Sequence, residues 1–331
     1  MINSKIISLE ELSKFDSTKN LNEQAKALIE HQKTTWDVTS KNYNNLANIE
    51  TRVFDFGHFK IKAQCNPERI RSSAAKTDAK SIAARPCFLC LNNLPNEQKG
   101  ILFQNKYLIL TNPYPIFPLH LTISNLGHIP QQILPHFNEM LEFSETLPDF
   151  TVFYNGPKCG ASAPDHFHFQ AGNNGFLPVI NEIDTLENNY SELVFQHENL
   201  KIIAVENYLR RLIAIISPNK KHILDKFEFI YHQLETNSGE EPKLNILCNY
   251  KYGKWRIIIF PRNAQHPSHF YKSEEKRIVV GPAAVELGGV LILPRAEDFK
   301  KITKKEIAEI YDEVSIEPKK FEALKAAIRN S

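Results

Sequence analysis

The sequence has 331 residues and a formal net charge of +2, and a hydrophobic fraction of 42% beside a charged fraction of 24% is typical of a folded protein. The near-balance of basic and acidic residues argues against a nucleic-acid-binding or membrane-surface protein, and no apolar run approaches the ~20 residues that a membrane helix needs. The first residues, MINSKIISLEELSKF, lack the apolar core of a secretory signal, so we expect a cytoplasmic protein.

In chain order, the hydrophobic periodicity predicts a mixture of helices and short strands. Before residue 175 we expect a helix at 21–50, strands at 53–56 and 59–63, a hairpin at 101–110, a strand at 116–124, a helix at 131–146 and a strand at 150–154. Beyond it we expect strands at 200–205 and 210–216, a helix at 222–235, a hairpin at 243–260, and helices at 297–313 and 317–329. Because hairpins and isolated helices occur without βαβ alternation, the pattern predicts an α+β chain.

Five cysteines are scattered along the chain, and two of them form the pair Cys87-x-x-Cys90. Since a cytoplasmic protein of this size does not rely on disulfides, the pair indicates metal or redox chemistry. A redox dithiol is less favoured because no βαβ context surrounds the pair, and two buried thiols are the plain alternative. Together with two distant histidines, the pair would form a four-ligand zinc site of the Cys2His2 type.

The run Asp165-His-Phe-His-Phe-Gln170 is the strongest candidate for chemistry. In an extended strand His166, His168 and Gln170 would share one face, and the two phenylalanines between them would point into a core. Two imidazoles and an amide on one face can bind a metal, attack a phosphorus atom and hold a phosphate oxygen. The alternative is a half-buried strand with two hydrogen-bonded histidines, which we disfavour because ionisable side chains are rarely grouped without a function.

A glycine-rich loop, Asn155-Gly-Pro-Lys-Cys-Gly-Ala-Ser162, lies just before this run. Gly156 and Gly160 would let backbone N–H groups approach an anion, while Lys158 and Ser162 would add a charge and a hydroxyl donor. Other cationic side chains are candidates for binding phosphates, each with a solvated surface charge as the simpler alternative: Arg71, Lys76, Arg85 and Arg262.

The segment Asn155-Gly-Pro-x-x-Gly-Ala-Ser-x-Pro followed by His-x-His-x-Gln170 resembles the active-site signature of the transferase branch of the histidine-triad superfamily. This branch contains galactose-1-phosphate uridylyltransferase, diadenosine tetraphosphate phosphorylase and GDP-hexose phosphorylases. Residues 118–128 are similar to an earlier strand of the superfamily, residues 85–90 to the cysteine segment of uridylyltransferases, and residues 281–299 to the C-terminal part of GDP-hexose phosphorylases. Asp165 departs from the uridylyltransferase pattern by adding one residue before His166.

The resemblance implies two tandem histidine-triad-like units, each an antiparallel sheet with helices packed on it. Residues 1–180 would carry the cysteine pair and the catalytic run, and residues 181–331 would form a second unit without that run. By resemblance His168 is the nucleophile, assisted by Gln170 and Ser162, and structural zinc is held by Cys87, Cys90, His128 and His166, with His120 as the rival third histidine. The residues expected to bind substrate are Asn155, Gly156, Lys158, Gly160, Arg262, Arg71 and Lys76.

These inferences predict an enzyme that transfers a nucleotidyl group through a covalent nucleotidyl-histidine. Glutamine at position 170 offers no base for water, so we expect inorganic phosphate to be the acceptor and an NDP-hexose, GDP-linked first, to be the donor. One alternative is a dinucleoside polyphosphate phosphorylase, and a sugar 1-phosphate is the alternative acceptor. A zinc-stabilised nucleotide-binding protein without turnover is the alternative from another class. For none of these do we expect a nucleic-acid or membrane partner.

Overall fold

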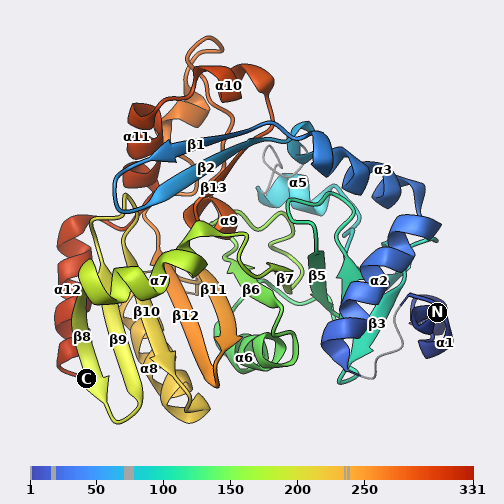
Figure 1. Ribbon diagram of the computed structural model, residues 1–331, viewed down its shortest axis with the longest axis horizontal. Helices are drawn as coiled ribbons and strands as arrows, with labels where there is room; N and C mark the ends of the chain where they lie inside the picture. Colours follow the sequence, from blue (N-terminus) through green and yellow to red (C-terminus); the bar gives the residue numbers. More distant parts are fainter. Residues whose placement is uncertain (1, 16–19, 71–77, 235, 237–238) are drawn as a thin grey trace.

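The computed structural model of the chain describes residues 2–15, 20–70, 78–234, 236 and 239–331, and it contains two β-sheets with helices packed around them (Figure 1). The strands are β1 (Thr51–Asp55), β2 (Lys60–Cys65), β3 (Gly100–Phe103), β4 (Tyr107–Thr111), β5 (His120–Asn125), β6 (Phe150–Asn155), β7 (His168–Asn173), β8 (Ser191–His197), β9 (Leu200–Val205), β10 (Leu212–Ser217), β11 (Leu244–Lys251), β12 (Lys254–Pro261) and β13 (Val290–Leu293).

The α-helices are α1 (Leu9–Ser13), α2 (Leu21–Thr35), α3 (Asp37–Asn45), α5 (Ala79–Ala83), α6 (Phe137–Thr146), α7 (Pro178–Asn189), α8 (Lys220–Gln233), α9 (Ala284–Leu287), α10 (Ala296–Lys301), α11 (Lys304–Val314) and α12 (Pro318–Arg329). Short 3-10 helices are η1 (Ile2–Ser4), η2 (Leu46–Asn48), η3 (Pro67–Arg69), η4 (Leu91–Asn93), η5 (Leu134–His136) and η6 (Ser268–Tyr271). Among the helices of the described residues, none combines the length and the apolar character needed to cross a membrane.

Ten strands form one antiparallel sheet in the spatial order β3-β4-β5-β7-β6-β11-β12-β10-β9-β8. The order contains the same arrangement twice. In each half, three strands are followed by a helix (α6 or α8) and by two further strands, the second of which pairs with the third strand of that half. The segment from β3 to β7 therefore corresponds to the segment from β8 to β12.

The two halves meet where β6 and β11 pair, and there Phe153 lies opposite Leu247. Phe153 also lies opposite Gln170 in its own half, and Leu247 opposite Ile258 in the other. Phe153 and Leu247 are thus equivalent positions that face each other, so an approximate two-fold axis passes between them. This architecture confirms the predicted α+β fold with two tandem histidine-triad-like units.

The two faces of the large sheet bury different cores, because successive side chains alternate across a strand. On one face Phe167 and Phe169 pack with apolar side chains of α2, α6, α8 and α12. On the other face Phe153 and Ile258 pack with α7, α9, α11 and the small sheet. His168 and Gln170 alternate with the first pair of phenylalanines, so they lie on the second face, as the sequence pattern predicted.

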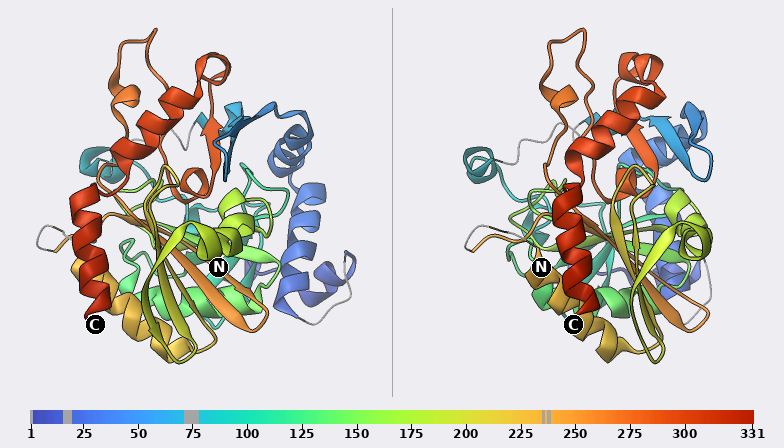
Figure 2. Two further views of the ribbon diagram at one scale, coloured as in Figure 1. Left: turned by 60° about the vertical axis from the view of Figure 1, so that its left-hand side comes forward. Right: turned by 90° about the vertical axis from the view of Figure 1, so that its left-hand side faces the viewer.

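The small sheet has the order β1-β2-β13 and lies along the top of the molecule in Figure 1. β1 and β2 form a hairpin that turns at Gly57, whose φ of +94° favours glycine. β13 pairs in parallel with β2, with Val290 opposite Lys62, and the views in Figure 2 show these strands from early and late in the chain side by side. Segments from both of the expected units, 1–180 and 181–331, therefore share one sheet.

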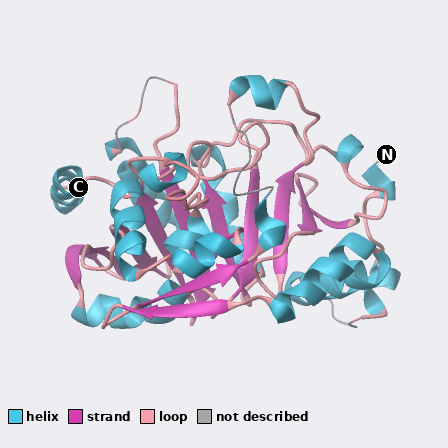
Figure 3. Ribbon diagram, turned by 90° about the horizontal axis from the view of Figure 1, so that it is seen from above, coloured by secondary structure: helices cyan, strands magenta, loops and turns pink. Residues whose placement is uncertain are grey.

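Two predicted helices are each divided in the structure. The helix expected at 21–50 is interrupted at Trp36, where the backbone is extended and the indole is buried. The helix expected at 297–313 is divided at Ile302, because Thr303 and Glu306 form a capping box that begins α11. The edge strand β8 and the short strand β13 were not predicted as separate strands. Seen from above, in Figure 3, the helices flank the strands of the large sheet on both sides.

Candidate active site and metal centre

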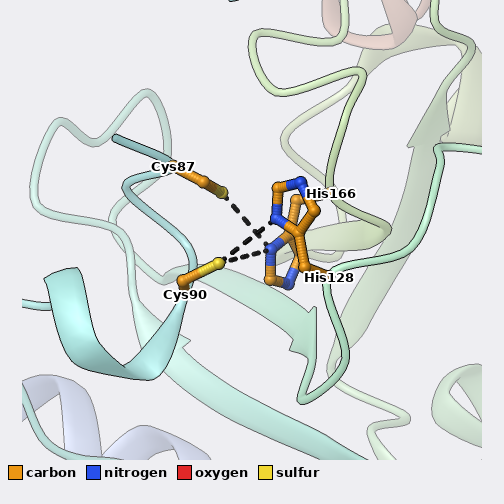
Figure 4. Close-up of side chains that lie close together, drawn as sticks. All are labelled: Cys87, Cys90, His128 and His166. Atoms are coloured by element: carbon orange, nitrogen blue, oxygen red, sulfur yellow. Dashed lines mark hydrogen bonds between the residues drawn. The ribbon is translucent and has the colours of Figure 1, made fainter. Parts of the chain in front are cut away.

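The predicted metal ligands come together in one cluster (Figure 4). Cys87 Sγ lies 3.3 Å from His166 Nδ1, and Cys90 Sγ lies 3.2 Å from His128 Nδ1 and 3.6 Å from His166 Nδ1. All four donor atoms lie within 4.8 Å of one another. Tetrahedral zinc with bonds of about 2.0–2.3 Å requires donor atoms about 3.3–3.8 Å apart. The donor set and its spacing therefore fit a zinc ion.

The other ring nitrogens of the two histidines face oxygen atoms. His166 Nε2 lies 2.7 Å from the carbonyl oxygen of Asn125 and 3.0 Å from Ser124 Oγ. His128 Nε2 lies 3.7 Å from a carboxylate oxygen of Asp165, the residue that the uridylyltransferase pattern lacks. Such oxygen partners orient metal-binding imidazoles, so each ring is turned with Nδ1 toward the sulfur atoms.

His120 does not belong to this cluster. Its Nδ1 accepts a hydrogen bond from the Ile116 N–H at 3.1 Å, so the remaining proton is on Nε2, which donates to Gln170 Oε1 at 3.0 Å. Burial lowers the pKa of His120 to about 3, with a further contribution from the charge of Arg69, and the ring is therefore neutral. Of the two rival histidines, His128 is the one placed at the cysteine pair.

His168 is the first residue of β7, and its side chain is 4% exposed. Nδ1 lies 2.8 Å from the backbone oxygen of His166, so Nδ1 carries the proton and donates it to that oxygen. Burial lowers the pKa of the His168 imidazole to about 4, which keeps the ring neutral near pH 7. Nε2 makes no hydrogen bond with any residue in the described part of the chain. A neutral imidazole with an unpaired Nε2 has a free lone pair and can act as a nucleophile.

The backbone of His168 is held by Gln131, which sequence analysis missed. Gln131 Oε1 accepts from the His168 N–H at 2.9 Å, and Gln131 Nε2 donates to the oxygens of His168 at 2.9 Å and Asn155 at 3.1 Å. The β6–β7 ladder ends at Phe153 and Gln170. Two positions further on, where Asn155 would otherwise pair with His168, the amide of Gln131 bonds the backbone of both. No local pattern reveals this role, because it depends on the register of two distant strands.

Gln170 and Asn155 present their amide groups in the same way. Gln170 Oε1 accepts from His120 and, at 3.5 Å, from Asn112 Nδ2. Asn155 Oδ1 accepts from Asn245 Nδ2 and from the Ala284 N–H, each at 2.9 Å. Because both oxygens are occupied, the orientation of each amide is determined, and within the described residues neither NH2 group has a partner. Both can donate to a phosphate oxygen.

The glycine-rich loop packs tightly against the C-terminal unit. Gly160 has φ of +94°, and a side chain there would meet the Cβ of Ala283 at 2.5 Å. A side chain at Gly156 would meet the oxygen of Leu244 at 2.9 Å. Glycine is therefore required at both positions for close approach. Ser162 lies at the end of this loop, and its backbone oxygen accepts from Arg85 Nη2 at 3.2 Å.

The cationic candidates differ widely in the hydrogen bonds that they make. Lys158 is exposed and pairs with Glu240 at 2.7 Å, and Arg85 pairs with Asp165 at 3.1 Å. Arg262 is buried, and its five N–H groups are directed at the oxygens of Val314, Asn245, Pro282, Ala264 and Gln265. No N–H group of Arg262 remains for a phosphate, and the side chain instead connects several segments of the C-terminal unit. Arg71 and Lys76 lie outside the described residues.

Two family models match the chain. Residues 28–173 match a domain of unknown function (DUF4922), and residues 185–331 match the GDPGP1-like C-terminal domain. A search of the curated proteins finds no match.

Among solved structures, the chain is similar to yeast Ap4A phosphorylase Apa2 in complex with Ap4A, with 14% identity and a TM-score of 0.61 over 88% of this chain and 97% of the yeast chain. The complex of the same enzyme with AMP aligns with 14% identity and a TM-score of 0.55, over 87% of this chain and 96% of the yeast chain. This similarity shows a shared fold, and it agrees with the resemblance found in the sequence.

Proposed function

We propose that this chain is a nucleotidyl-transferring phosphorylase whose nucleophile is Nε2 of His168. The observation that carries the proposal is the hydrogen bond from His168 Nδ1 to the backbone oxygen of His166, which leaves Nε2 unprotonated and unpaired in a buried position. An imidazole in this state attacks a phosphorus atom without prior loss of a proton.

The reaction would proceed in two displacements. In the first, an Nε2–P bond forms to the α-phosphorus and the P–O bond to the leaving phosphate group breaks. In the second, an oxygen of inorganic phosphate forms a P–O bond and the N–P bond breaks, which returns neutral His168 and releases a nucleoside diphosphate. The unpaired amide NH2 groups of Gln170 and Asn155 would donate to phosphoryl oxygens, whose negative charge grows in each transition state.

We propose zinc for the cluster of Cys87, Cys90, His128 and His166. Zinc with four protein ligands has no open position, so it would supply structural cross-linking and no reaction step. His168 lies two residues after His166, a member of this cluster, and its Nδ1 donates to the backbone oxygen of His166. A rigid ligand cluster would therefore hold the orientation of the nucleophile.

We propose phosphate as the acceptor because Gln170 has no titrating group that assists water. Two classes of donor are the first to test. The resemblance of residues 281–299 to GDP-hexose phosphorylases favours GDP-hexoses. The yeast enzyme of the same fold, which was solved with Ap4A and with AMP, favours dinucleoside polyphosphates.

The test is a panel of GDP-hexoses, UDP-hexoses and Ap4A, each with and without inorganic phosphate, with the nucleotide product identified by chromatography. We expect a nucleoside diphosphate that forms only when phosphate is present. A nucleoside monophosphate formed at equal rates in both conditions would instead identify a hydrolase. A product formed only with hexose 1-phosphate would identify an exchanging transferase, and no turnover with any donor would favour a binding protein.

The nucleophile is tested with His168→Ala, which should abolish both turnover and covalent labelling by a radioactive donor. The control is His31→Ala, since His31 is also a buried histidine, and its ring contacts Gln32 and Thr35 of its own helix α2. Near-normal activity of His168→Ala would refute the mechanism.

A further inference from the structure

Arg69 lies at the end of η3, directly after β2, and no sequence pattern singled it out. One of its terminal nitrogens, Nη1, donates to the backbone oxygen of Tyr114 at 2.8 Å. The neighbouring Asn66 Nδ2 donates to the backbone oxygen of Pro115 at 3.2 Å. η3 is therefore attached at two points to the loop that connects β4 with β5.

The remaining N–H groups of Arg69 are unpaired in the described part of the chain, and no carboxylate there forms an ion pair with it. Burial lowers the pKa of its guanidinium to about 10, and the charge of Glu286 opposes this effect. Arg262 differs from Arg69 because all of its N–H groups are directed at protein oxygens. A half-buried guanidinium whose Nε and Nη2 have no partner among the described residues can bind phosphate through two parallel hydrogen bonds.

The loop that holds Arg69 also holds Gln170. Asn112 and His120, at the two ends of this loop, both donate to Gln170 Oε1. Arg69 Nη1 donates to the Tyr114 oxygen, and two residues later the Ile116 N–H donates to His120 Nδ1. The charge of Arg69 also lowers the pKa of His120. Arg69 and Gln170 are thus both held by the short segment from Asn112 to His120.

We propose that Arg69, together with Gln170 Nε2, binds the phosphate group that leaves the donor and the inorganic phosphate that enters in its place. The proposal rests on the function proposed above. In both displacements the group that leaves or enters lies opposite His168 Nε2, so the two occupy one subsite. That subsite needs a cation, because a phosphate dianion must approach an α-phosphoryl group that already carries negative charge.

The test compares Arg69→Met and Arg69→Lys with Arg52→Met as a matched control. Arg52 on β1 also donates through Nη1 to a backbone oxygen, that of Phe299 at 2.7 Å, and it has no contact with the β4–β5 loop. Two reactions are followed on each variant. The first is labelling of His168 by a nucleoside 5′-phosphorimidazolide, whose leaving group contains no phosphate, and the second is discharge of the labelled enzyme by inorganic phosphate.

We expect Arg69→Met to be labelled by the phosphorimidazolide at the wild-type rate. The phosphate concentration for half-maximal discharge should rise roughly 10- to 100-fold, the effect of losing a charged hydrogen-bonding partner. Arg69→Lys should recover part of this loss, and Arg52→Met should change neither reaction. An unchanged phosphate dependence, or labelling slowed as much as discharge, would overturn the subsite. Failure of the wild-type protein to take any label would instead refute the function itself and the subsite with it.

Discussion

At the residue scale, the site is organised by amide groups whose oxygens are already bound by the protein. Gln170 Oε1 accepts from His120 and Asn112, and Asn155 Oδ1 accepts from Asn245 and Ala284. An amide can rotate by half a turn at little cost in water, but here rotation would bring NH2 groups against other donors. The protein thereby presents donors, and not acceptors, to a phosphate.

This arrangement predicts the effect of Gln170→Glu. The carboxylate would still accept from His120 and Asn112, but its other oxygen would repel a phosphoryl oxygen. We expect kcat to fall by about 100-fold or more, the cost of losing one oxyanion-binding donor. Gln170→Ala, which removes the donor without adding charge, should be less severe. Steady-state kinetics with phosphate as the acceptor measures both variants, and equal losses would contradict the role of charge.

Glu241 is a buried carboxyl beside the glycine-rich loop, and it predicts a pH dependence of stability. It accepts from the Tyr154 hydroxyl at 2.6 Å and the Ile133 N–H at 2.5 Å, and burial raises its pKa to about 7. The folded state therefore holds this proton more tightly than the unfolded state, whose carboxyl has a pKa near 4.5. The contribution of this group to stability is complete below about pH 4.5 and is lost as the pH rises through 7.

Denaturant unfolding of the wild-type protein and Glu241→Gln between pH 5 and pH 8 measures this effect. The free energy of unfolding of the wild type, relative to the variant, should decrease with rising pH by up to about 3 kcal/mol. Parallel curves for the two proteins would mean that Glu241 titrates equally in both states.

At the element scale, β7 begins at His168, and two sets of side-chain contacts hold that end of the strand. Gln131 binds the backbone of His168, and two residues earlier His166 contacts Cys87 in the Cys2His2 cluster. Strand ends are usually less well ordered than strand centres, so a nucleophile at such a position needs support from outside the ladder.

Gln131→Met tests the first of these devices. Methionine keeps the volume of the side chain but leaves the His168 N–H and oxygen without their partner. We expect the rate of His168 labelling to fall by roughly tenfold or more, since small misplacement of a nucleophile is costly. Gln32→Met is the matched control, because Gln32 is also buried and bonds the backbone of Lys99 and Glu97 far from the site. Equal losses in the two variants would point to stability alone.

Cys87→Ser tests the second device. The purified wild-type protein should contain about one zinc per chain by elemental analysis, and the variant should lose the metal, melt at a lower temperature and take label slowly. Cys65→Ser is the control, since Cys65 is buried in the small sheet away from the cluster. A metal-free wild-type protein with full activity would contradict the proposed role of zinc.

At the scale of the whole molecule, the approximate two-fold axis relates two halves of which only the first contains the His-x-His-x-Gln run. The position equivalent to Gln170 is Ile258 on β12, and the same face there also carries Phe260. These side chains pack with α11 and the small sheet. The second unit therefore fills with core side chains the face on which the first unit places Gln170.

The extent to which sequence predicts this site follows from the same geometry. His168 and Gln170 were predicted from one short motif, and the family resemblance added the two distant histidines to the cysteine pair. The structure brings these four side chains together in one cluster. Gln131 and Arg69 act through contacts between distant segments, which no local pattern encodes. Arg262 resembles a phosphate ligand in the sequence, but the fold surrounds it with protein oxygens. The boundary between the predicted units likewise gave no indication that β2 and β13 would pair.

The parallel pairing of β2 with β13 has a consequence for the order in which the protein matures during synthesis. Residues 60–65 leave the ribosome more than 200 residues before Val290–Leu293. The edge of β2 that pairs with β13 therefore stays without its partner strand until almost the entire chain has been made. β6 waits similarly for β11. η3 is attached beside β2, and a newly made N-terminal half would therefore hold His168 before the surroundings of Arg69 are complete. The site would be complete only after β13 has been made and has paired with β2, with roughly the last tenth of the chain still to be translated.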